Sequence, residues 1–178
     1  MKSTDVYRVL RTRLGPTCNT AGLRRTRGGM LGWHRPTRAG HLVLFFQCTQ
    51  HGWGPLSPHL GSMFTLSFQR SPAPRPGAGL GVYFLRFNTL LTPDDLALVR
   101  EYQRQVIADL QRQWSAFVQG QAAGYRETLN ADVWSHLPWM LYGTETHVER
   151  WADFFVPRLP RLLADFEALA AGQPEGGA

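Results

Sequence analysis

The chain of 178 residues lacks the features of exported, disulfide-rich and membrane-spanning proteins. It has only two cysteines, Cys18 and Cys48, and its first residues are charged, which does not fit a signal peptide. Its longest apolar run, Leu42 to Phe46, is far shorter than the roughly 20 residues that cross a bilayer. We therefore expect a cytoplasmic protein with reduced cysteines and no membrane partner.

Acidic residues are scarce in the first part of the chain. Residues 1–40 contain Lys2 and eight arginines against the single acid Asp5, whereas the remainder carries a small net negative charge and the whole chain +6. Such asymmetry indicates a surface for nucleic acid or another anionic partner. The length and a hydrophobic fraction of 43% favour a single packed domain over residues 1–171, followed by a disordered tail over residues 172–178.

Motifs for a cofactor or a metal ion are also missing. The sequence has no glycine-rich dinucleotide-binding pattern and no P-loop. Cys48 and His51 have the spacing of one zinc-ligand pair, and His59 follows, but a second pair is absent. We therefore expect neither cofactor nor metal. The alternative function is a small hydrolase or nuclease with a site near His51 and His59, in which Cys48 could pair with either imidazole.

The stretch from His41 to Gln69 predicts the centre of the fold. His41 to Gln50 is apolar on both faces, as is typical of a central strand that is covered on both sides. Met63 to Gln69 alternates between an apolar face and a more polar face. The members of these two faces are Phe64, Leu66 and Phe68, and Met63, Thr65, Ser67 and Gln69. Weaker strands are expected near 23–27 and 30–35, joined by a turn at Gly28-Gly29, and over 82–87.

Helices are expected before and after these strands. An amphipathic helix is predicted over residues 4–14, where Gly15-Pro16 either ends it or breaks it before a further turn. Thr92-Pro93 predicts the start of a long helix that reaches about residue 118. A last helix starts near Thr144 and is kinked or divided by Pro157 and Pro160. The order predicts an α+β fold, with an antiparallel sheet of about four to five strands backed by these helices.

The basic hairpin is the leading candidate for a binding site. Arginines offer planar cations that match phosphate geometry, and a neighbouring tryptophan could stack on a base. The predicted site for a protein partner or nucleic acid consists of Arg24, Arg25, Arg27, Trp33, Arg35, Arg38 and Trp53. The alternative is a solvated hairpin whose arginine stems lie on apolar surface. We expect a non-enzymatic binding module that uses this hairpin and a face of the sheet.

Four short features, in this order, resemble the bacterial domain-of-unknown-function 4304 family. They are Gly22-Leu23-Arg24-Arg25 after the first helix, Phe46-Gln47 at the end of a strand, Phe64-Thr65-Leu66, and Pro138-Trp139 before a helix with Leu159-Pro160. The chain departs from the family pattern at Ser67, which stands in place of a polar amide, and in two longer loops. The resemblance implies an α+β fold and an accessory or immunity role in bacterial conflict systems, and it supplies no catalytic residue.

Overall fold

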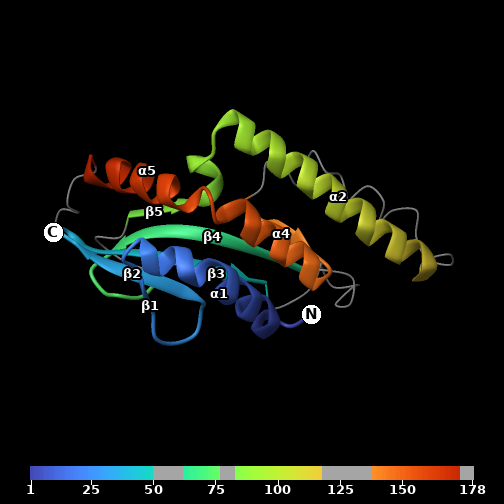
Figure 1. The fold of residues 1–178 in the computed structure, drawn as a ribbon, viewed down its shortest axis with the longest axis horizontal. Coiled ribbons are helices and arrows are strands. Elements are labelled where there is room, and N and C mark those ends of the chain that lie inside the picture. Colours follow the sequence, from blue (N-terminus) through green and yellow to red (C-terminus); the bar gives the residue numbers. More distant parts are fainter. Residues whose placement is uncertain (50–61, 77–82, 118–137, 173–178) are drawn as a thin grey trace.

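The computed structural model describes residues 1–49, 62–76, 83–117 and 138–172. These residues form an α+β domain in which helices pack on an antiparallel sheet (Figure 1). The predicted fold class is confirmed, and the sheet has six strands rather than four to five.

The elements follow one another along the chain as α1 (Ser3–Thr20), β1 (Arg24–Arg25), β2 (Gly32–Thr37), β3 (Gly40–Cys48), β4 (Ser62–Ser71), β5 (Tyr83–Arg86), the short 3-10 helix η1 (Phe87–Leu90), α2 (Pro93–Phe117), β6 (Met140–Tyr142), α4 (Glu145–Phe155) and α5 (Leu159–Ala171).

The predicted strand pair lies at the centre of the sheet. The strand order is β1-β2-β3-β4-β5, and every neighbouring pair is antiparallel. β6 pairs with the first residues of β4, while β5 pairs with later ones, so both strands lie along the same edge of β4. The hairpin predicted before His41 is confirmed, and β6 adds a further short strand.

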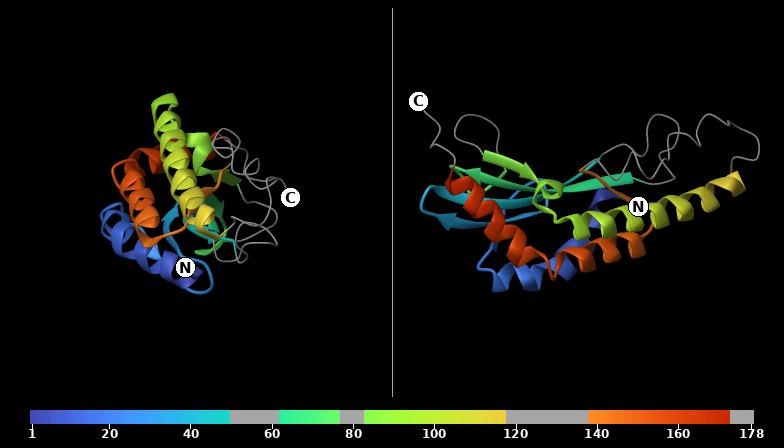
Figure 2. Two further views of the ribbon diagram at one scale, coloured as in Figure 1. Left: turned by 90° about the vertical axis from the view of Figure 1, so that its right-hand side faces the viewer. Right: turned by 90° about the horizontal axis from the view of Figure 1, so that it is seen from above.

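One face of the sheet carries the main core. The right-hand view of Figure 2 shows α1, α4 and α5 on the same side of the strands. Phe46, Phe64 and Phe68 point to this side from β3 and β4, and all three are fully buried. Trp151 and Phe155 of α4 belong to the same apolar cluster. The alternation predicted for β4 is therefore confirmed for its apolar face.

The opposite face of β4 is polar in composition but is not an open surface. Thr65, Ser67 and Gln69 are each at most 1% exposed, and Val43 on β3 is completely buried. Ser67 accepts a hydrogen bond of 3.1 Å from Nη1 of Arg86. The middle of this face is therefore buried, whereas Phe84 of β5, which pairs with Gln69 on the same face, is 40% exposed.

The carboxylate of Asp95 connects the first turn of α2 to the junction between α4 and α5. Thr92 Oγ1 accepts the backbone N–H of Asp95 at 3.1 Å, which confirms the predicted N-cap. The C-terminal helix is divided, because α4 ends at Phe155 and α5 begins at Leu159. Arg158, which lies between the two helices, and Arg161 of α5 both donate hydrogen bonds to the Asp95 carboxylate. This arrangement ties the first turn of α2 to the junction of α4 and α5.

Among the helices that the structure describes, none combines the length and the apolar character needed to cross a membrane.

Candidate anion-binding surface

The end of α1 determines where the first basic strand begins. The helix runs continuously through Pro16 to Thr20, so the break that Gly15-Pro16 allowed does not occur. It ends in a Schellman motif, in which the N–H of Leu23 donates to the carbonyl of Cys18 at 2.9 Å. Gly22 has a positive φ of 73°, which that motif requires. The chain reverses within these residues and enters β1 directly.

β1 is the edge strand of the sheet, and its two arginines point to opposite faces. Arg24 pairs with His34 and Arg25 with Trp33, and directly opposed residues of an antiparallel pair share a face. Arg25 therefore lies on the helix side and Arg24 on the other side. Arg27 follows in the turn that contains Gly28 and Gly29, both with positive φ, as predicted.

Arg25 and Arg11 bring like charges together at the junction of β1 and α1. Nη1 of Arg25 donates a 3.0 Å hydrogen bond to the carbonyl of Gly32, and its guanidinium lies 5.5 Å from the centre of the Trp33 ring. Burial and the positive charge of Arg11 lower the pKa of the Arg25 guanidinium. The two cations therefore repel each other in the free protein.

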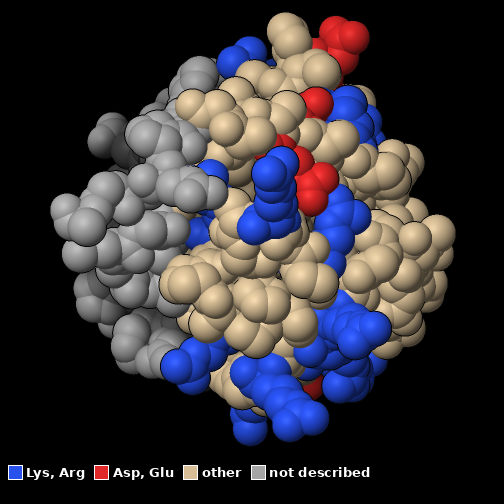
Figure 3. All heavy atoms as spheres, turned by 90° about the vertical axis from the view of Figure 1, so that its left-hand side faces the viewer, with Lys and Arg blue, Asp and Glu red and all other residues tan. Residues whose placement is uncertain are grey.

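We define the basic surface as Arg11 of α1, Arg24 and Arg25 of β1, and Arg27 of the following turn. All four side chains are exposed, and none has an ion pair with a carboxylate within the described part of the chain. Lys and Arg side chains gather along the lower part of the face in Figure 3, where β1 and the turn after it lie. Such a cluster creates a positive potential that favours an anionic partner.

The other arginines of α1 are neutralised by α4. Nη2 of Arg8 lies 2.7 Å from Oε2 of Glu145, and Nη2 of Arg13 lies 2.9 Å from Oε1 of Glu149. These exposed pairs follow the seam between the two helices, and each contributes little to stability. Their relevance is electrostatic, because they remove Arg8 and Arg13 from the charge that is available to a ligand.

The structure separates Arg35 and Arg38 from the basic surface. Arg35 forms a forked ion pair with Glu167 of α5, with nitrogen–oxygen distances of 3.2 and 2.6 Å, and also donates to the carbonyl of Ala21. Arg38 lies in the turn between β2 and β3, at the opposite end of β2 from Arg27. Arg35 therefore connects elements of the fold, and Arg38 faces a different part of the molecule.

Of the two tryptophans that were predicted to contact a ligand, only Trp33 lies in the described part of the chain. Trp33 is 1% exposed and packs edge-on against Phe46, with ring centres 6.4 Å apart. Its ring belongs to the core and cannot offer a face to a base, which corrects the expected stacking role. The sequence missed this because the β2 pattern is too short to show which face is buried. Trp53 lies outside the described residues.

His34 and His41 lie beside each other next to Arg24. Their rings meet edge-on with centres 5.5 Å apart, and both Nδ1 atoms are buried with no hydrogen-bond partner in the described chain. Burial, His41 and Arg24 together lower the pKa of His34. The lowered pKa means that His34 adds little positive charge to the basic surface at neutral pH.

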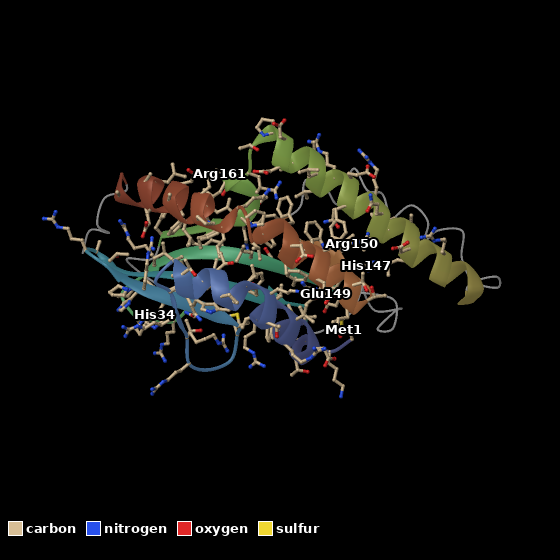
Figure 4. All side chains as sticks on the ribbon, viewed as in Figure 1. Met1, His34, His147, Glu149, Arg150 and Arg161 are labelled. Carbon is tan, nitrogen blue, oxygen red and sulfur yellow. The ribbon has the colours of Figure 1, made fainter. Side chains whose placement is uncertain are left out.

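Asp109 and His147 form a pair that resembles half of a catalytic triad. Nε2 of His147 lies 3.0 Å from Oδ2 of Asp109, and His147 is 4% exposed. Its other nitrogen, Nδ1, accepts the backbone N–H of Gly143 at 3.0 Å. Both ring nitrogens are therefore occupied, and Nδ1 has no free lone pair to activate a nucleophile. Figure 4 shows His147 on α4, far from His34 on β2.

This pair connects α2 to the start of α4, and its removal has a measurable cost. Replacing Asp109 by alanine is expected to lower the free energy of unfolding by about 1–2 kcal/mol, because the buried Nε2–H of His147 loses its acceptor. Asp109→Asn retains an acceptor oxygen and is expected to cost less. Urea denaturation at neutral pH measures both variants, and equal losses would contradict this role for the hydrogen bond.

The pH dependence of the Asp109 contribution has a definite sign. The hydrogen bond from His147 lowers the pKa of Asp109, and Arg112 lowers it further. Because the folded-state pKa lies below that of the unfolded chain, the contribution is complete above about pH 4 and is lost as the pH falls further. The difference between wild type and Asp109→Ala should shrink over that acidic range.

The alternative enzyme site receives no support from the described residues. His51 and His59 lie outside them. Burial raises the pKa of the Cys48 thiol to about 12, which disfavours the thiolate that a nucleophile requires. Cys18 and Cys48 are both unpaired. In the described parts of the chain, no group of three or more metal-binding side chains comes together.

Sequence reasoning missed Arg11 as a member of the basic surface. Its position on an amphipathic helix did not show which arginines face acids and which face β1. The only available signal was the excess of arginine over acid in residues 1–40. The pairing of Arg8 and Arg13 depends on acids more than 130 residues away along the chain, with separations of 137 and 136 residues.

Comparison with known proteins adds no relative: no protein-family model matches the chain, and no curated protein or solved structure matches it either. The resemblance to the domain-of-unknown-function 4304 family therefore stays a prediction.

Proposed function

We propose that the protein is a non-catalytic binding module whose basic surface binds the phosphate backbone of nucleic acid. One observation carries this proposal. Four arginines from α1, β1 and the following turn surround the β1 edge of the sheet without a carboxylate partner in the described chain, whereas Arg8, Arg13 and Arg35 are all ion-paired within the fold. A polyanion would relieve the repulsion between these uncompensated charges.

The chemistry of the basic surface favours phosphate over an acidic protein. Guanidinium groups form paired hydrogen bonds with phosphate oxygens. A protein interface usually has an apolar or aromatic centre that is buried on binding. Near the basic surface, Met30 at 36% exposure is the single large hydrophobic side chain of the described residues that could serve this purpose. Among the described residues, the surface therefore has the charge of an interface and only this one apolar side chain to anchor a protein partner.

The proposed contacts do not read sequence. Contacts to phosphate position a protein on nucleic acid, and base-edge contacts supply specificity. The buried Trp33 leaves the basic surface without a described aromatic that could stack on a base. We therefore expect binding with weak dependence on base sequence. An accessory or immunity role in a bacterial conflict system is the setting that the family resemblance suggests for such a module.

Fluorescence anisotropy with labelled duplex and single-stranded oligonucleotides of mixed sequence tests the proposal. At low salt the protein should bind with a dissociation constant in roughly the micromolar range, as non-specific phosphate contacts give under favourable conditions. Oligonucleotides of different sequence but equal length should bind with similar affinity. The absence of binding at low salt would contradict the proposal.

A further inference from the structure

Two half-buried histidines, His34 of β2 and His41 of β3, adjoin the basic surface on the face of the sheet that does not carry the helices. His34 (Figure 4) lies opposite Arg24 of β1 in the strand register, and directly opposed residues of an antiparallel pair share a face. The ring of His41 meets that of His34 edge-on, with centres 5.5 Å apart. A phosphate bound at Arg24 would therefore lie beside an imidazole ring.

The groups that face His34 within the described chain are positive or neutral. The charges that act on its ring are those of His41 on β3 and Arg24 on β1. On β4, the residues that follow in the same rows across the sheet are Gln69 and Ser71, and neither carries a charge. Among the described residues of these strands, no carboxylate is therefore placed to stabilise a protonated His34 in the free protein.

The buried side of each ring also opposes the charged form. Nδ1 of His34 and Nδ1 of His41 are buried, and neither has a hydrogen-bond partner within the described residues. A protonated imidazole donates from both nitrogens, so its buried N–H would lack an acceptor there. Burial, His41 and Arg24 lower the pKa of His34. In the free protein, His34 therefore takes up a proton only below about pH 6.5, the ordinary value for histidine.

We propose that His34 is a further phosphate-binding residue of the basic surface, which joins the four arginines by taking up a proton from solvent when nucleic acid binds. This role rests on the proposed function, because the phosphate concerned is the one bound at Arg24. That phosphate cancels the positive charge of Arg24, which opposes protonation, and it attracts the protonated ring. Binding and protonation therefore favour each other, and acidic pH strengthens binding.

The titration of His34 in the full chain, followed by NMR through its Cε1–H signal, tests this coupling directly. In the free protein the midpoint should lie below about pH 6.5, and saturation with mixed-sequence duplex DNA should raise it by about one pH unit. Arg24→Gln should raise the midpoint in the free protein, because it removes a neighbouring cation. A midpoint that stays unchanged in either experiment would overturn the proposal.

The affinity for duplex DNA should show the same coupling. Between pH 8 and pH 5.5, anisotropy titrations of wild type should show binding that tightens severalfold, up to about tenfold, the limit that a midpoint shift of one pH unit sets. The slope of the logarithm of the binding constant against that of salt concentration should steepen by about 0.9 at the lower pH, as one more phosphate contact requires. His34→Gln should lose most of both changes, and their full retention would overturn the proposal.

A permanent positive charge at this position provides the matched variant. His34→Arg should bind duplex DNA at pH 8 about as tightly as wild type does at pH 5.5, and its affinity should vary little with pH. Thermal unfolding at both pH values confirms that each variant is folded. If wild type binds equally well at both pH values, this inference fails and the proposed function stands. If wild type binds at neither pH value, the proposed function fails as well.

Discussion

Replacing Arg11, Arg24 and Arg27 together by glutamate is expected to weaken nucleic-acid binding by about a hundredfold or more at low salt. The change removes three of the four cations of the basic surface and places negative charge beside the phosphate backbone. Arg25 is left intact because its side chain bonds to Gly32 and covers the buried Trp33. The three substituted side chains are exposed. Anisotropy titration measures the loss, and thermal unfolding confirms that the variant is folded.

A matched control separates a local effect from one of net charge. Arg100, Arg104 and Arg150 are exposed on α2 and α4, and none of them belongs to the elements that carry the basic surface. Replacing these three arginines by glutamate changes the net charge of the protein by the same amount. We expect this control to weaken binding only a fewfold, through its effect on the overall field. Equal losses in the two variants would contradict a localised basic surface.

Replacing Asp95 by alanine is expected to lower the free energy of unfolding by about 3 kcal/mol, because a nearly buried carboxylate with charged partners is lost. Asp95 is 7% exposed, and Oδ1 accepts the Nε–H of Arg158 at 2.6 Å. Arg161 donates to the other oxygen, and the backbone N–H of Thr92 also donates to it at 3.3 Å. The substitution therefore removes an N-terminal capping interaction of α2 and the link to the α4–α5 junction.

The neighbouring acid gives the control for this prediction. Asp94 is exposed and acts only through the dipole of the first turn, so Asp94→Ala should cost about 0.5 kcal/mol. Urea denaturation at neutral pH compares the two variants, and similar losses would contradict the role assigned to Asp95. Burial raises the pKa of Asp95, but hydrogen bonds from Arg158 and Thr92 outweigh it and hold the pKa below its usual value. The advantage of wild type should therefore decrease as the pH falls below about 4.

Local patterns predicted the elements of the fold well. The alternation in β4, the apolar run of β3 and the capping residue Thr92 are local signals, and each is confirmed. The course of α1 through Pro16 was left open, because the missing N–H is a local cost that packing of the helix against α4 can outweigh. The burial of Ser67 and Gln69 was not predicted, because a strand's own pattern does not show what covers its polar face.

The composition of the site depended on contacts that are distant in sequence. Arg24, Arg25 and Arg27 follow from the hairpin, which local turn residues predicted. Arg35 is removed from the site by Glu167, which lies 132 residues later. Arg11 joins it because the chain reverses after α1 and brings Arg25 of β1 close to Arg11. A sequence shows an excess of charge in a segment, whereas the folded chain determines which of those charges remain unpaired.

The salt dependence of nucleic-acid binding tests the central claim most directly. For wild type bound to duplex DNA, the logarithm of the binding constant should fall against the logarithm of salt concentration with a slope of about −3 to −4, as four phosphate contacts require. The variant with Arg11, Arg24 and Arg27 replaced by glutamate should show a slope of about −1 or flatter. Binding that is absent at low salt, or equal slopes for the two proteins, would contradict the proposed function.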